Sequence, residues 1–185
     1  MNASPATPAP GGVIWLTGLS GAGKSTLAGQ LHADLRARGR LAAIIDGDEL
    51  RRGLSRDLGF GPAARAENVR RAAEVAGMFA AAGVVAIVAL ISPLRADRRL
   101  AREILTRRHL ACAEVYVHAP LAVCEERDPK GLYRRARAGA IPEFTGISAP
   151  YEPPEIPALE LRTDLAGVED CARRLLEFTQ AFLGN

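Results

Sequence analysis

Apolar residues in this chain follow two alternating patterns, short continuous runs and runs at helical spacing. Continuous apolar runs, each of a length suited to a buried strand, lie at residues 13–17, 41–45, 84–91 and 113–118, with a weaker run at 158–161. Helical spacing, bounded in several places by Gly or Pro, predicts helices at 24–38, 48–54, 65–82, 95–108, 121–126 and 167–183. Strands that alternate with helices are typical of a parallel sheet, so we expect a three-layer α/β/α sandwich.

Three candidate functional residues each come directly after the end of a predicted strand. Gly18 follows the first strand, Asp46 the second and Ser92 the third. Right-handed crossovers place the carboxyl ends of parallel strands at one edge of the sheet, where open α/β folds bind their ligands. We therefore expect the three motifs to share one cleft.

A phosphate-binding pattern, G-x-x-x-x-G-K-[ST], begins directly after the first strand. Its glycines let consecutive backbone N–H groups surround a phosphate, while Lys24 reaches the outer phosphates and the Ser25 hydroxyl is placed to ligate Mg²⁺. A chance glycine-rich turn is the alternative, but the strand before the loop and the helical spacing of leucines after it favour a P-loop NTPase or kinase fold. The expected ATP-binding residues are Gly18, Leu19, Ser20, Gly21, Ala22, Gly23, Lys24, Ser25 and Thr26.

Two carboxylates, Asp46 and Asp48, flank Gly47 at the end of the second strand. A carboxylate at this place can hold a water of the Mg²⁺ shell or accept the proton of an attacking hydroxyl, two tasks that phosphoryl transfer requires. The alternative is a turn in which Asp48 caps the next helix. The strand at 84–91 ends without an acidic residue, although many P-loop proteins keep a Mg²⁺-organising Asp there, so we assign this duty to Asp46 or Asp48 and leave open which one is the base.

A second group of residues, Arg51, Phe60, Arg65 and Asn68, has the chemistry of a pocket for an anion that carries a flat ring. Arginine pairs with phosphate or sulfate, and phenylalanine stacks on a ring. From spacing alone the plainer alternative is favoured, an exposed basic helix face with Phe60 as an ordinary core residue.

The segment at about 128–157 breaks the alternation of strands and helices. It combines basic residues with glycines and prolines, and its aromatic and apolar residues are anchors that a disordered linker would lack. We expect a loop-rich lid rather than a passive loop.

The length of 185 residues and a hydrophobic content of 48%, which is that of an ordinary globular protein, indicate one domain. Residues 1–12 have neither the basic start nor the apolar middle of a secretory signal, so we expect a disordered leader before a single domain at 13–185. The longest apolar stretch, at 78–91, is too short for a membrane span.

Charge and cysteine content exclude other classes. The net charge of +3 comes from scattered arginine pairs, and only 5% of residues are aromatic, so no nucleic-acid partner is expected. The cysteines are three in number, without a C-x-x-C pair, which indicates neither a disulfide framework nor a zinc site and favours the cytoplasm.

A series of longer motifs resembles the adenylylsulfate kinase family. The stretches are D-G-D-E-L-R-R-G-L at 46–54, R-D-L-G-F at 56–60, R-A-E-N at 65–68, I-S-P at 91–93, D-P-K-G-L-Y at 128–133 and F-T-G-I at 144–147. The similarity extends from residue 13 to the C-terminal helix, and the order of the motifs is highly specific.

The resemblance implies transfer of the ATP γ-phosphoryl group to the ribose 3′-hydroxyl of adenosine 5′-phosphosulfate (APS), which gives 3′-phosphoadenosine 5′-phosphosulfate (PAPS), the second step of sulfate activation. ATP would be the co-substrate and Mg²⁺ the cofactor. Phe60 and Phe144 would sandwich the adenine of APS. The APS-binding residues implied by the family pattern are Asp48, Arg51, Phe60, Arg65, Asn68, Ile91, Ser92, Lys130 and Phe144.

The same resemblance implies a homodimer and makes an ATP sulfurylase a candidate partner. Ser92 is either a phosphoserine formed in turnover or a positioning hydroxyl, and in-line transfer, which needs no enzyme nucleophile, favours positioning. The competing hypotheses are a P-loop kinase of another small hydroxyl substrate and a regulatory subunit that binds APS without turnover.

Overall fold

The computed structural model describes residues 11–184, which form a five-stranded parallel sheet of order β2-β3-β1-β4-β5. The strands are β1 (Gly12–Thr17), β2 (Ala42–Asp46), β3 (Val85–Ala89), β4 (Cys112–His118) and β5 (Leu159–Arg162). Neighbouring strands are joined in parallel register, with Ile14 of β1 opposite Ile87 of β3 on one side and Ala113 of β4 on the other. The parallel sheet expected from the apolar runs is confirmed.

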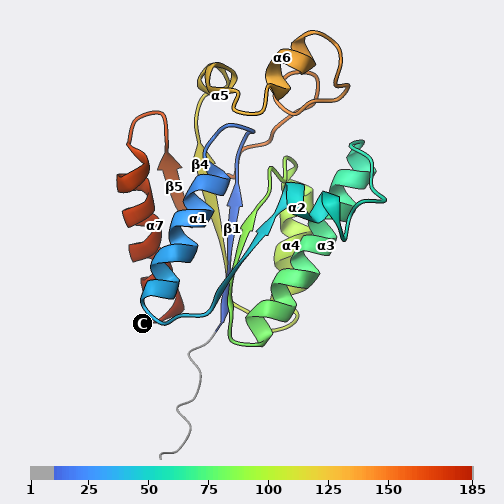
Figure 1. The fold of residues 1–185 in the computed structure, drawn as a ribbon. Helices are drawn as coiled ribbons and strands as arrows, with labels where there is room; N and C mark the ends of the chain where they lie inside the picture. The colour runs from blue at the N-terminus through green and yellow to red at the C-terminus, as the bar shows by residue number, and fades with distance from the viewer. Residues whose placement is uncertain (1–10, 185) are drawn as a thin grey trace, which may run out of the picture.

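The helices cover both faces of this sheet, as Figure 1 shows, with α1 and α7 on one side and α3 and α4 on the other. Their bounds are α1 (Lys24–Ala37), α2 (Gly47–Arg52), α3 (Pro62–Ala81), α4 (Arg95–Thr106), α5 (Leu121–Arg127), α6 (Leu132–Arg137) and α7 (Val168–Leu183). Alternate side chains of β1 point to opposite faces, so Ile14 and Leu16 pack with α1 and α7 whereas Val13 and Trp15 pack with α3 and α4. The molecule is therefore the three-layer sandwich that the sequence predicts.

Two helices differ from the expectation. The helix α3 begins at Pro62, three residues before the predicted start, because proline fits the first turn, where its missing N–H has no helical partner. The helix α6 lies inside the segment at 128–157, so the expectation of irregular structure there is wrong for residues 132–137. Figure 1 shows α5 and α6 beyond the carboxyl ends of the strands.

The predicted leader meets the fold at its last residues. Gly12 is the first residue of β1 and pairs with Val85, so the sheet begins one residue earlier than expected. A Cβ on Gly12 would lie 2.4 Å from a terminal methyl group of Leu183, so a larger residue here would require the Leu183 side chain to shift. The rest of the predicted leader, residues 1–10, lies outside the described residues.

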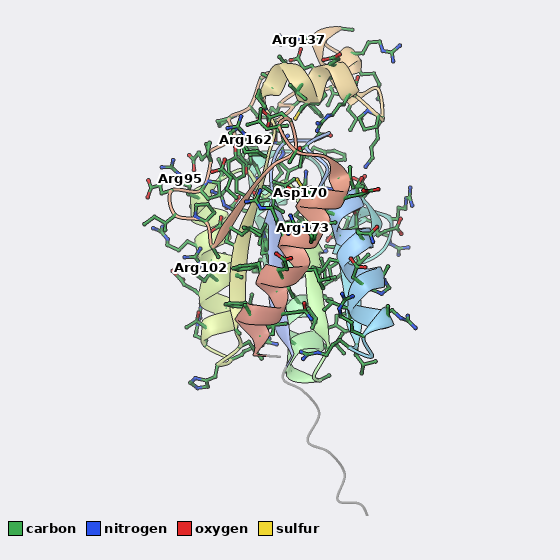
Figure 2. The ribbon with its side chains drawn as sticks, turned by 90° about the vertical axis from the view of Figure 1, so that its left-hand side faces the viewer. Arg95, Arg102, Arg137, Arg162, Asp170 and Arg173 are labelled. Carbon is green, nitrogen blue, oxygen red and sulfur yellow. The ribbon has the colours of Figure 1, made fainter. Side chains whose placement is uncertain are left out.

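Charged side chains are distributed over separate elements rather than gathered in one block (Figure 2). The arginines labelled there pair with carboxylates, as Arg95 with Glu155, Arg102 with Glu114, Arg137 with Glu125, Arg162 with Asp164 and Arg173 with Asp170. The three cysteines are free. Among residues 11–184, no helix combines the length and apolar character needed to cross a membrane.

Candidate active site

One cavity of about 970 Å³ lies at the carboxyl ends of the strands and brings the separated motifs together. It is lined by the loop before α1, by the end of β2, by parts of α2 and α3, by residues 89–93 at the end of β3 and beyond it, and by parts of the segment 127–145. The expectation of one shared cleft is thus confirmed. Of the predicted site residues, only Gly18, Leu19 and Ala22 do not line this cavity.

The phosphate-binding loop adopts backbone conformations that only its glycines allow without strain. Gly23 caps α1 in the left-handed conformation, with φ 104°. A Cβ on Gly18 would lie 2.2 Å from the carbonyl oxygen of Val117, so only glycine lets the loop pass this close to β4. The backbone N–H groups at the start of α1 remain available for an anion.

Lys24 lies inside this loop with its side chain buried. Its Nζ donates hydrogen bonds to the carbonyl oxygens of Gly18 at 2.9 Å and Leu19 at 2.8 Å. Burial lowers the pKa of Lys24 to about 8, because the charged ammonium loses its hydration. An anionic phosphate in the loop would favour the charged form.

Two residues outside the predicted site donate hydrogen bonds to the phosphate-binding loop. Thr163 donates its hydroxyl to the carbonyl oxygen of Ala22 at 2.8 Å, and Arg127 donates to Gly21 at 3.3 Å and to the carbonyl of Thr163. Both residues line the cavity. Thr163 comes directly after the last strand, and the carboxyl ends of all strands in a parallel sheet lie at the same edge. This position could therefore have identified Thr163 as a site residue from the sequence.

The two carboxylates after β2 have different partners. Asp46 accepts the Ser25 hydroxyl on Oδ2 at 2.8 Å and the backbone N–H of Asp48 on Oδ1 at 2.9 Å. Asp46 is therefore the N-cap of α2, and the alternative in which Asp48 caps this helix is wrong. The Asp48 carboxylate instead forms an ion pair with Lys130, which belongs to the segment 128–157.

The oxygens of Ser25 and Asp46 are the kind of ligands that Mg²⁺ prefers. Within residues 11–184 no group of three or more His, Cys, Asp or Glu side chains could hold a metal. Mg²⁺ commonly keeps several waters and binds one or two protein oxygens plus substrate phosphates, so this sparse donor set fits it.

The other end of the cavity carries the second predicted group. The Phe60 ring is 63% exposed, so the alternative that places it in the core is wrong. The Arg51 guanidinium lies 4.4 Å above this ring and donates to the carbonyl oxygen of Gly59 at 2.8 Å. Partial burial lowers the pKa of Arg51 and of Arg65, a desolvation cost that a bound anion would offset.

Residues 143–145 contact this group of residues from the segment 128–157. Arg65 of α3 donates to the Thr145 hydroxyl at 3.0 Å and to the carbonyl oxygen of Glu143. Asn68 is buried, and its Oδ1 has no hydrogen-bond partner among the described residues. Phe144 is buried with its ring edge-on to Tyr133, the centroids 5.0 Å apart.

Ser92 lines the cavity and is only 3% exposed. Its Oγ accepts the indole N–H of Trp15 at 3.1 Å, and its carbonyl oxygen accepts a hydrogen bond from Arg98 at 2.8 Å. Sequence reasoning missed both partners. For Arg98 a signal existed, because it precedes the buried Ala101 and Leu105 by three and seven residues and so shares their helix face.

Comparison with known proteins assigns this chain to a family. The family described as Adenylylsulphate kinase matches residues 10–162. The chain belongs to this family. It is 55% identical over 168 residues to the adenylyl-sulfate kinase of Paraburkholderia xenovorans, covering 91% of this chain and 92% of that one. The adenylyl-sulfate kinase of Saccharomyces cerevisiae is 51% identical, with 91% and 83% covered.

Solved structures of adenylylsulfate kinases have the same fold. The APS kinase of Mycobacterium tuberculosis, in complex with AMPPNP and APS, superposes with a TM-score of 0.91 at 44% identity, over 94% of this chain and 99% of that one. A hexameric APS kinase from Thiobacillus denitrificans gives 0.71 at 32% identity, over 94% of this chain and 29% of that one. A gluconokinase from Sinorhizobium meliloti, at 19% identity and a TM-score of 0.60, shares the fold alone.

Proposed function

We propose that this chain transfers the γ-phosphoryl group of ATP to the ribose 3′-hydroxyl of APS, giving PAPS and ADP. The observation that carries the proposal is the single cavity, lined at one end by the phosphate-binding loop and at the other by Arg51, Phe60, Arg65 and Asn68. Membership of the adenylylsulfate kinase family supports the choice of acceptor.

The ATP end is served by Lys24 and the backbone of residues 18–26. In the described structure Lys24 bonds to two loop carbonyls, and exchanging them for phosphate oxygens would restore the charge that burial disfavours. Lys24 would then neutralise negative charge that develops on the transferred group. Ser25 and Asp46 would hold Mg²⁺, which would neutralise part of the negative charge of the nucleotide phosphates.

The two carboxylates divide the remaining work. Asp46 is already engaged on both oxygens, by the Ser25 hydroxyl and by the N–H of Asp48. Within residues 11–184 the Asp48 carboxylate is paired with Lys130, an exposed and flexible type of side chain that an incoming substrate could displace. We assign Asp48 as the base that accepts the 3′-hydroxyl proton and Asp46 as the residue that orients Ser25 and the metal.

The acceptor end offers a ring site and anion sites. The adenine of APS would stack on Phe60 and meet Phe144 across the cavity. Arg51 and Arg65 would pair with the phosphosulfate, and the unpartnered Oδ1 of Asn68 would accept a hydrogen bond from the nucleotide. Each of these groups lines the same cavity.

Ser92 is assigned as a positioning residue rather than a nucleophile. Its hydroxyl is buried and accepts the Trp15 indole N–H, and direct in-line transfer needs no covalent relay. A phosphoserine here would have to displace that contact.

We further propose that the segment 128–157 acts as a lid. Its contacts cross the cavity, through Lys130 to Asp48 of α2 and through Thr145 and Glu143 to Arg65 of α3. Such a cover would exclude water from the phosphoryl group. A homodimer, association with an ATP sulfurylase, the absence of a nucleic-acid partner and a cytoplasmic location stay predictions.

The test is a discontinuous assay of the purified protein with Mg-ATP and APS that resolves PAPS and ADP, with AMP as an alternative acceptor. We expect PAPS from the wild type and none above background from Lys24→Ala. ATP consumption without PAPS would point to another hydroxyl acceptor. Tight APS binding without turnover would favour a regulatory subunit.

A further inference from the structure

The loop after β3 contains a strained residue that touches the proposed acceptor site. Ser92 has φ 39°, a left-handed conformation that non-glycine residues rarely adopt. Such conformations persist only where surrounding contacts determine them. Ile91 and Ser92 both line the cavity, so whatever fixes this backbone also shapes the site.

Besides the Trp15 indole and the Thr17 hydroxyl, which lies 3.5 Å from the Ser92 carbonyl oxygen, the guanidinium of Arg98 in α4 contacts this residue. Its Nη1 donates to the Ser92 carbonyl at 2.8 Å, its Nη2 to the Glu152 carbonyl at 2.8 Å, and its Nε to the Glu114 carboxylate at 2.5 Å. The side chain is 4% exposed and does not line the cavity. Arg98 therefore contacts Ser92, β4 and Glu152 of the lid segment, although its own side chain does not line the cavity.

A second set of contacts ties the same segments together. The Thr17 hydroxyl donates to the Ile91 carbonyl at 2.7 Å and lies 3.1 Å from the Tyr151 hydroxyl. The Arg98 guanidinium lies 5.9 Å from the centre of the Tyr151 ring. Residues 151–152 of the lid segment thus contact the loop that carries Ser92 and the arginine that binds it.

We propose that Arg98 is a positioning residue for APS, which holds Ser92 in its left-handed conformation and fixes the wall of the acceptor site against the end of the lid segment. The planar fork of arginine can reach three acceptors in fixed directions, which lysine cannot do. The proposal rests on the proposed function for its choice of acceptor. Its structural part, that Arg98 fixes the loop, stands on the contacts alone.

The chain offers a matched control one helical turn away. Arg102 binds the same carboxylate, through Oε2 of Glu114 at 2.5 Å, but its side chain is 54% exposed and it makes no hydrogen bond to Ser92. A role for Arg98 that lay only in pairing with Glu114 would be shared by Arg102. A role in positioning Ser92 would not.

The experiment compares Arg98→Lys with Arg102→Lys in the full chain. Steady-state kinetics give the KM for APS and the KM for Mg-ATP, and the emission of Trp15, the single tryptophan of the chain, reports on the Ser92 hydroxyl that it contacts. For Arg98→Lys we expect the KM for APS to rise about tenfold or more and the KM for Mg-ATP to stay within about twofold. The Trp15 emission should also shift, and Arg102→Lys should match the wild type in all three measurements.

A second variant guards against misfolding of the first. The double change Arg98→Met with Glu114→Gln removes both charges together, so no unpaired charge stays buried, and Arg102→Lys remains its control. Circular dichroism confirms that each variant is folded. The double variant should reproduce the rise in the KM for APS, while its control should not.

The proposal is overturned if the folded Arg98 variants lower kcat with both KM values unchanged, or if Arg102→Lys has the same effect. It is also overturned if the Trp15 emission does not change. Should the wild type fail to phosphorylate APS, the proposed function would fail, and the emission comparison would still decide whether Arg98 fixes the Ser92 loop.

Discussion

Nucleotide binding should make Lys24 take up a proton at alkaline pH. Burial lowers the pKa of Lys24 to about 8 in the free protein, from an ordinary value of 10.5. A triphosphate beside the ammonium favours the charged form and returns the pKa toward its ordinary value. Between these two pKa values the free protein holds a neutral Lys24 and the complex a charged one, so binding must draw a proton from solution.

The magnitude follows from the two pKa values. With a pKa of about 8 in the free protein and 10.5 in the complex, binding takes up about 0.1 proton at pH 7 and about 0.9 proton at pH 9. The affinity should fall as pH rises through this window, because the deprotonated free protein must first be protonated. The limit is a factor of roughly 300, which corresponds to the 2.5-unit difference between 8 and 10.5.

The assay is isothermal titration calorimetry with a non-hydrolysable ATP analogue and Mg²⁺, in buffers of different ionisation enthalpy. The dependence of the observed heat on buffer enthalpy gives the number of protons taken up. Lys130→Met, which removes the other lysine that lines the cavity, is the control and should keep the uptake at pH 9. Lys24→Arg should abolish it, since arginine stays charged throughout this range. Uptake near zero at pH 9 in the wild type, or uptake that survives in Lys24→Arg, would refute the reasoning.

Further changes test the metal site, the base, the loop and the core. Asp48→Asn should lower kcat by about 10²-fold or more, and an equal loss in Asp46→Asn would argue against a single base. Asp46→Asn keeps a capping oxygen, so the free energy of unfolding should change by less than about 1 kcal/mol while the Mg²⁺ concentration for half-maximal rate rises; an unchanged Mg²⁺ dependence would contradict the metal assignment. Gly18→Ala places a Cβ 2.2 Å from the Val117 carbonyl oxygen and should weaken binding of the ATP analogue by roughly tenfold or more in calorimetry, whereas wild-type affinity would show that the loop can yield. Leu31→Ala removes a fully buried side chain and should cost about 2–5 kcal/mol in urea unfolding, a value under about 1 kcal/mol being the contrary result.

Several features of the fold were predictable because they depend on local pattern. Continuous apolar runs mark buried parallel strands, and each strand of the sheet was expected within a few residues of its observed bounds. The phosphate-binding loop is a contiguous motif, and its chemistry depends on residues that are neighbours in the chain. The position of Asp46 and Ser92 beside that loop followed from the rule that parallel strands end at one edge.

Local pattern was a poor guide to the lid segment and the ring site. The helix α6 has six residues between glycines, too few to show a helical period. Phe60 was placed in the core by spacing alone, because an aromatic residue is usually buried, yet the fold leaves it open to the cavity. Its place in the site came from the resemblance to a family, not from periodicity.

The sequence by itself determined the layers of the fold, the phosphate site and, through its ordered motifs, the family. Only the tertiary structure decided which carboxylate caps α2 and which is left facing Lys130. It also decided that Trp15 and Arg98 hold Ser92. The physical reason is distance along the chain: Trp15 and Ser92 are 77 residues apart, and a hydrogen bond between them depends on the packing of β1, β3 and α4 as a whole. No local propensity encodes such a contact, because the same side chains would satisfy their hydrogen bonds with water until the fold excludes it.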